Sequence, residues 1–171
     1  MMILQALKSD VSKLIQVTRA CAKDMISKGI YQWNDEYPSA EVFDNDIELN
    51  QLWVLKEDDK IIGSIVISNI IDEEYKTVDW LTPTQHNCYI HRLAVHPDYQ
   101  GQGRAQQLMN FAENYAIEQN FISVRLDTFS VNDRNNKFYN IHKGQRCFIL
   151  GSGPSINKQD LKPLRNEICF A

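Results

Sequence analysis

The segment spanning residues 88–119 constrains the fold most. An apolar run over residues 88–95 is typical of a buried strand, and it stops before Pro97. A polar loop containing Gly101 and Gly103 follows, and apolar residues then recur at helical spacing. The first N–H groups of a helix have no internal acceptor, and they lie at the positive end of its dipole. A strand, a small-residue loop and a helix in this order therefore predict an anion cradle for a phosphate-bearing cofactor.

Known nucleotide loops do not match this segment. It lacks the Gly-Lys-Ser/Thr ending of a P-loop, and it has too few glycines, too late in the chain, for a dinucleotide fingerprint. Two glycines at a helix start also serve ordinary tight turns with close helix–strand packing. From the glycines alone, both interpretations stay open.

Length and charge set the broad class. A chain of 171 residues is expected to form one domain, residues 1–171, with a real core. The net charge of −4 argues against general nucleic-acid binding. No apolar run approaches the roughly 18–20 residues of a membrane span, and the N-terminus lacks a signal-peptide profile. We expect a cytoplasmic protein with no nucleic-acid or membrane partner.

Cysteines and histidines do not predict a metal site. The cysteines are widely spaced and are expected to be reduced, mostly buried thiols: Cys21, Cys88, Cys147 and Cys169. His86, Cys88, His91 and His96 cluster in sequence. On a strand, however, residues 86 and 88 point to one side and residue 91 to the other.

Periodicity and turn residues predict the other elements. Helices are expected over 11–25, after Ser39, over 103–119 and from 132 or 133 through 139 to an end near Gly144. Strands are expected over 3–7, 52–55, 61–67, 88–95, 122–126, 146–150 and 167–170. Asp10 and Ser39 are expected to be helix N-caps, and Gly29 a helix end. This order is that of a mixed α/β domain.

Residues 91–105 resemble motif A of the GNAT superfamily of N-acetyltransferases, written Gln/Arg-x-x-Gly-x-Gly/Ala. Gln100, Gly103 and Ala105 fill that pattern. A second group follows the strand near residue 124 at the spacing of the superfamily's later helix: Asn132, Asn135, Phe138 and Tyr139. Residues 31–33 and 37–38 resemble a bacterial branch.

The resemblance implies a fold and a co-substrate. The fold is a single-domain α/β arrangement with a mixed, mostly antiparallel central sheet and helices on both faces. The sheet is splayed at the cofactor strand near Leu93 and Ala94. The implied co-substrate is acetyl-CoA (coenzyme A), and the resemblance implies no metal.

By the same resemblance, the coenzyme diphosphate would sit on the N–H groups of residues 102–105. The backbone of Leu93 and Val95 would pair with the pantetheine arm, and an N–H there would hold the developing oxyanion. The full set of expected coenzyme-binding residues is Leu93, Ala94, Val95, Gln100, Gly101, Gln102, Gly103, Arg104, Ala105, Asn132, Asn135 and Phe138. Arg104 and Lys137 are candidates for the nucleotide phosphates, or simply solvated charges.

The implied chemistry is direct attack by a neutral amine on the thioester. Tyr139 matches the position of the general acid, although a packed aromatic is the alternative. His91 is the first candidate for the general base, since its side chain titrates in the right range, but it could equally be a core or cleft histidine. Glu36, Glu41 and Asp46 are further candidates for the base.

The acceptor-binding residues are expected to be Trp33, Glu36, Tyr37 and Asp46. Trp33 could instead be core, and the acidic second helix could be a solvated face. The sequence does not name the acceptor.

The sequence thus predicts an N-acetyltransferase that acetylates a primary amine of a small molecule or peptide in a ternary complex. The alternatives are a non-catalytic acyl-CoA-binding sensor or partner module and, less favoured, a protein for another phosphorylated ligand. A homodimer is possible through an exposed C-terminal edge strand.

Overall fold

The computed structural model describes residues 1–73, 76, 80, 83–127 and 150–151. The chain divides into two compact units, one of residues 1–67 and 91–113 and the other of residues 68–90 and 114–171. Strand β4 (Cys88–Val95) and helix α3 (Arg104–Glu118) each contribute residues to both units. The expectation of a single domain stays a prediction.

The first unit is built on an antiparallel ribbon. Strand β1 (Met2–Gln5) pairs with β2 (Leu52–Glu57), and β2 pairs with β3 (Lys60–Ser68). The hairpin between β2 and β3 turns at Asp58 and Asp59, whose φ angles are 46° and 65°. Positive φ at both central residues suits the twist of a two-residue hairpin. The predicted hairpin is confirmed.

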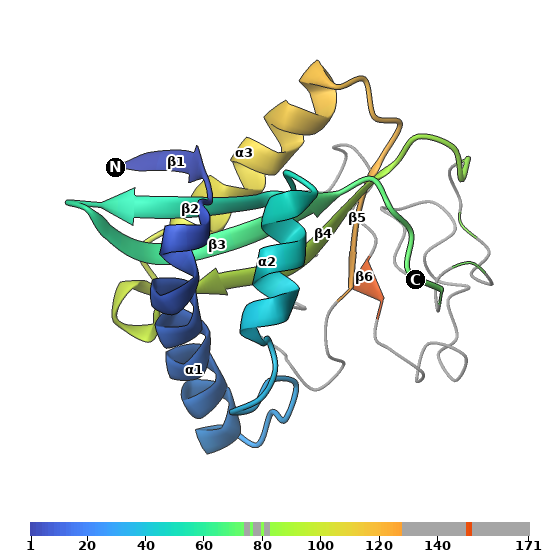
Figure 1. The fold of residues 1–171 in the computed structure, drawn as a ribbon. Helices are drawn as coiled ribbons and strands as arrows, with labels where there is room; N and C mark the ends of the chain where they lie inside the picture. Colours follow the sequence, from blue (N-terminus) through green and yellow to red (C-terminus); the bar gives the residue numbers. More distant parts are fainter. Residues whose placement is uncertain (74–75, 77–79, 81–82, 128–149, 152–171) are drawn as a thin grey trace. The chain divides into compact units, whose positions relative to one another are not determined.

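Helices cover both faces of this ribbon (Figure 1). On one face lie α1 (Val11–Ser27) and α2 (Ala40–Glu48). On the other face, the Trp53 ring of β2 lies 4.8 Å from the Phe111 ring of α3, measured between centroids. Successive strand residues point to opposite faces, so β2 sends alternate side chains to the two helix layers.

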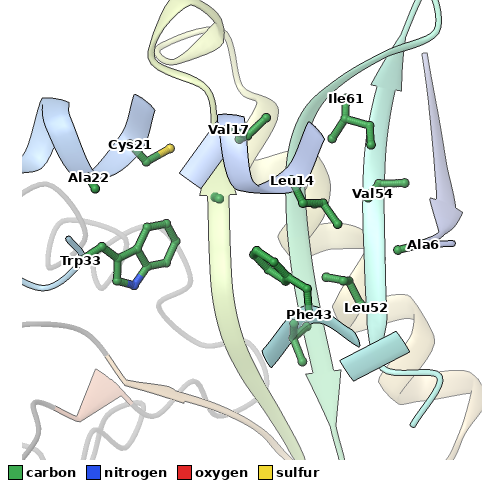
Figure 2. Close-up of a cluster of buried hydrophobic side chains, with 12 residues drawn as sticks. Ala6, Leu14, Val17, Cys21, Ala22, Trp33, Phe43, Leu52, Val54 and Ile61 are labelled. Carbon is green, nitrogen blue, oxygen red and sulfur yellow. The ribbon is translucent and has the colours of Figure 1, made fainter. Parts of the chain in front are cut away.

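The core between the sheet and the first two helices is apolar (Figure 2). Leu14 of α1, Phe43 of α2 and Leu52 of β2 are fully buried within it. Helices α1 and α2 are thereby held against β2 and β3, because removing apolar area from water is the dominant favourable term in folding.

The helix ends follow the predicted residues with one correction. Gly29, at φ +76°, ends α1: its N–H donates to the Ile26 carbonyl and the Ile30 N–H donates to the Met25 carbonyl, both at 3.0 Å. Ser39 caps α2, its Oγ accepting from the Val42 N–H at 3.3 Å.

Asp10 precedes α1 but its side chain does not cap that helix. A short 3-10 helix, η1 (Lys8–Asp10), comes first, and the Asp10 Oδ2 accepts from the Leu7 N–H at 3.1 Å. Asp10 also pairs with Lys56 of β2, at 3.1 Å from Nζ to Oδ1. Asp10 therefore stands at the predicted N-cap position of α1, but its side chain makes no capping hydrogen bond there, because its carboxylate serves the preceding turn and a strand.

The described strands of the second unit pair in parallel. Strand β5 (Val124–Asp127) pairs with Cys88–Ile90 of β4, and β6 (Leu150–Gly151) pairs with β5, both in parallel. A crossover through a helix is the usual way to bring consecutive strands into parallel register, and α3 supplies it here. Together with the antiparallel ribbon, this confirms the expected mixed α/β fold.

Of the other predicted elements, the helix that was expected to end near Gly144 and the strand over 167–170 lie outside the described residues, as do residues 146–149. No helix in the described ranges is both long enough and apolar enough to cross a membrane.

Candidate functional site

The loop between β4 and α3 is held by one glutamine. After the 3-10 helix η3 (Pro97–Tyr99), the Gln100 N–H donates to the Pro97 carbonyl at 3.1 Å. The Gln100 side chain donates from Nε2 to the Val95 carbonyl oxygen at 2.8 Å. This contact folds the loop back on the end of β4, so Gln100 fixes the positions of Gly101 and Gly103.

Gly101 and Gly103 are exposed, and both have φ at +76°. Only glycine adopts this conformation without steric cost. A Cβ built on either residue would meet no atom within 4 Å, so the space over the backbone is open. The turn therefore requires glycine, and it leaves room for a ligand to approach the main chain.

The start of α3 presents main-chain donors next to these glycines. The Gln107 N–H donates to the Gly103 carbonyl at 3.0 Å, which sets the first full turn of the helix. The N–H groups of Arg104 and Ala105 belong to that first turn, where a helix has no intrahelical acceptor for its N–H groups. An open approach to the backbone and the positive end of a helix together fit a phosphate group.

Arg104, an expected phosphate ligand, is already paired. Its Nη2 lies 3.1 Å from Oε1 of Glu57, and its side chain is only 22% exposed. Among the described residues, its buried Nε has no hydrogen-bond partner. The Arg104 guanidinium is therefore not a freely solvated charge. Glu57 already occupies one of its nitrogen donors, so the guanidinium as it lies here does not serve a ligand alone.

Strand β4 lies very close to β3 beside this loop. The His96 N–H donates to the Ile62 carbonyl at 2.8 Å. A Cβ on Gly63 would lie 2.7 Å from the Ala94 carbonyl oxygen. Gly63 is therefore required by close packing against the expected cofactor strand, and sequence reasoning did not single it out.

Arg92 is the main residue that sequence reasoning missed. It lies in the middle of β4 with φ at +47°, a conformation that residues other than glycine rarely adopt. Its guanidinium makes a two-point contact with Asp46 of α2, with Nε 2.8 Å from Oδ2 and Nη2 2.6 Å from Oδ1. The sequence signal available was an arginine inside an apolar strand, beside the candidate base His91.

Asp46 is 2% exposed, so it is not part of a solvated acidic face. Burial raises the pKa of the Asp46 carboxyl, and the charges of Arg92 and His91 and the Arg92 hydrogen bonds act against that rise. The Arg92 Nη1 lies 3.5 Å from the Tyr37 hydroxyl. The structure thus brings two expected acceptor residues, Tyr37 and Asp46, to one arginine.

Other expected site residues lie as follows. Trp33 is 8% exposed and packs in the hydrophobic core, which is the core role that the sequence left open. Glu36 and Glu41 are exposed, and His91 is half-buried. Ala94 and Val95 are buried, while Leu93 is half-buried.

The second expected group, Asn132, Asn135, Phe138 and Tyr139, lies outside the described residues. Its roles stay predictions, as does that of Lys137. In the described part of the chain, no cluster of three or more His, Cys, Asp or Glu residues is arranged to hold a metal ion.

Comparisons with known proteins agree on one family. The model described as the acetyltransferase (GNAT) family matches residues 17–142. An uncharacterized N-acetyltransferase of Bacillus subtilis (strain 168), YesJ, is 23% identical over 136 residues, covering 78% of this chain and 76% of that protein.

Solved structures agree with that family. The crystal structure of a protein assigned as an acetyltransferase from Staphylococcus aureus Mu50 matches with a TM-score of 0.68 and 28% identity, covering 82% of this chain and 89% of that chain. Another, from Clostridium acetobutylicum and solved with acetyl-CoA, matches with a TM-score of 0.57 and 23% identity, covering 81% of this chain and 87% of that chain.

Proposed function

Because the chain belongs to the acetyltransferase (GNAT) family, we propose that it transfers an acetyl group from acetyl-CoA to a primary amine of a small molecule or peptide, within a ternary complex. The observation that carries this proposal is the open glycine loop at the start of α3. Its N–H groups suit a diphosphate, which acetyl-CoA contains. The acetyl-CoA in the C. acetobutylicum relative supports the same choice.

The end of β4 supports the rest of the coenzyme site. Bound acetyl-CoA would supply an activated acyl carbon in its thioester. The backbone at Leu93 and Val95 would pair with the pantetheine arm as an added strand does. A main-chain N–H at this point would face the acyl oxygen, where negative charge develops during transfer.

The proton transfers involve residues of two kinds. His91 is half-buried on β4 and is our proposed base, since an imidazole titrates near neutral pH. Tyr139 is our proposed acid, because a phenol stays protonated at neutral pH and can donate its proton to the leaving thiolate. Tyr37 and Glu36, both exposed, are proposed to contact the acceptor.

The direct test is release of free coenzyme A from acetyl-CoA with a panel of polyamines, aminoglycosides, amino acids and N-terminal peptides. We expect at least one amine to support release. Tyr139→Phe should then lower kcat by roughly 100-fold. Coenzyme binding without release for any amine would favour a non-catalytic binding module instead.

Gly103→Glu should abolish acetyl-CoA binding. It places a carboxylate where the diphosphate is proposed to lie, and it also strains a residue at φ +76°. Binding is measured by the coenzyme-dependent rise in melting temperature. We expect that rise to disappear.

Gly29→Glu is the matched control. Gly29 has the same φ and equally open surroundings, but it ends α1. Both variants should lose stability through the backbone, whereas only Gly103→Glu should lose the response to coenzyme. A normal response in Gly103→Glu would overturn the proposed site.

A further inference from the structure

The expected cofactor strand contains an unfavourable backbone conformation at Arg92. Its φ of +47° lies inside β4, which runs from Cys88 to Val95. A left-handed conformation is unfavourable for an L-amino acid, because Cβ comes too close to the backbone carbonyl oxygen. Such strained residues persist only where the surrounding structure holds them, and they turn the adjoining peptide groups out of regular alternation. The N–H of Leu93 belongs to one of those peptide groups.

The contacts of the Arg92 side chain can hold it in this conformation. The guanidinium is planar, so its two bonds to the Asp46 carboxylate fix both distance and orientation. The side chains are 17% exposed for Arg92 and 3% for Asp46, so water competes little for either partner.

Asp46 is itself anchored. It lies on α2, where the neighbouring Phe43 is fully buried in the core and Ser39 caps the first turn. The Asp46 carbonyl accepts from the Gln51 N–H at 2.9 Å, just before β2 begins. The carboxylate therefore comes from a rigid part of the first unit.

We propose that the Asp46–Arg92 ion pair is a clamp that holds β4 in its irregular conformation, and that it thereby orients the Leu93 N–H toward the thioester oxygen. Both residues are positioning residues, since neither needs to touch the reacting atoms. The catalytic part of this inference rests on the proposed acetyl transfer. The backbone part does not.

The test removes both charges together. Taking away one partner of a buried pair leaves an unpaired charge, which often unfolds a protein. Arg92→Gly/Asp46→Asn avoids this. Glycine can adopt the positive φ without strain, but it adopts negative φ about as readily, so the variant has no side chain that holds the backbone in this conformation. Asn retains the size of Asp46.

Two readouts are needed. Amide hydrogen exchange at His96, whose N–H donates to the Ile62 carbonyl at 2.8 Å, reports without ligand how firmly β4 is held, and we expect faster exchange in the double variant. Steady-state kinetics report its use in catalysis. We expect kcat to fall roughly 10- to 100-fold, with the acceptor KM little changed, because small misplacements of a donor are costly.

Asp24→Asn is the matched control. It breaks an exposed ion pair with Lys28 on α1, whose Nζ and Oδ2 lie 2.6 Å apart. Exchange at His96 and kcat should both stay at the wild-type values. If the double variant does not fold, Arg92→Lys replaces it, keeping the charge while losing the planar fork.

Unchanged His96 exchange in a folded variant overturns the clamp. Faster exchange with wild-type kcat overturns its catalytic role. Failure of the wild-type protein to acetylate any amine overturns the proposed function instead, and the exchange measurement still decides whether the clamp exists.

Discussion

At the scale of single residues, burial decides which titratable groups are available for chemistry. Asp46 and Glu41 lie on the same short helix, and the sequence makes both of them candidates for the general base. In the structure, Asp46 is buried against Arg92 whereas Glu41 is exposed. A carboxylate paired in two-point geometry is a poor base, because its lone pairs are already occupied. Our proposed base is therefore His91.

Arg125 is a second charged residue whose environment is set by burial, here on strand β5. It is fully buried on β5, with Nη1 3.1 Å from the Tyr89 hydroxyl and Nη2 2.9 Å from the Pro83 carbonyl oxygen. Its guanidinium carbon lies 4.2 Å from the centroid of the Trp80 ring. Alternation along β5 suggests that this position faces water, but strands in parallel sheets are commonly buried on both faces.

The buried thiols give a residue-scale prediction. Burial raises the pKa of both Cys21 and Cys88 from 9.0 to about 12. The pKa of each thiol is higher in the folded protein than in the unfolded chain. The contribution of the two thiols to the free energy of unfolding is therefore complete below about pH 9, and it is lost as pH rises through about 12.

In a Cys147→Ser/Cys169→Ser background, neither remaining thiol should react with an aromatic disulfide reagent near pH 8, because the thiolate is the reactive form. Both should react once urea unfolds the protein. Rapid labelling of the folded protein would contradict the burial of these residues.

At the scale of elements, caps and turns were the most predictable features. Ser39, Gly29 and the Asp58–Asp59 turn act through their own neighbours in sequence, so their roles can be inferred locally. Contacts between elements were less predictable. The sequence predicts that Asp10 caps a helix, but its carboxylate forms an ion pair with Lys56 of β2 instead.

Gly63→Ala tests the approach of β3 to β4. The new methyl group would lie 2.7 Å from a backbone oxygen, so one strand must move. We expect a loss of about 1–3 kcal/mol, as for other overpacked sites, measured by urea unfolding.

The control for this variant is the next residue along β3. Ser64 is fully buried, and among the described residues its hydroxyl has no hydrogen-bond partner. Ser64→Ala should therefore be neutral or slightly stabilising. Equal stability of Gly63→Ala and wild type would show that β4 is not held this close to β3.

At the scale of the whole molecule, a specific ligand should stabilise the folded chain by mass action. Acetyl-CoA at about 100 times its Kd should add about 2.7 kcal/mol to the free energy of unfolding. We expect a clear rise in melting temperature with acetyl-CoA, and none with ATP or NAD at the same concentration. An equal rise with ATP would point to another phosphorylated ligand.

The sequence by itself determined the family, the glycine loop and most of the helix and strand order. These depend on local spacing: period 2 or 3.6, a glycine where φ is positive, and a motif within a few residues. The boundaries of β4 and the helix that follows it could be predicted for this reason.

Tertiary structure alone decided the state of the groups around that loop. Pairing of Arg92 with Asp46, of Arg104 with Glu57, and the close approach at Gly63 all join residues more than thirty positions apart in the sequence. Such contacts depend on how the elements pack, and burial then sets both the charge and the freedom of each side chain.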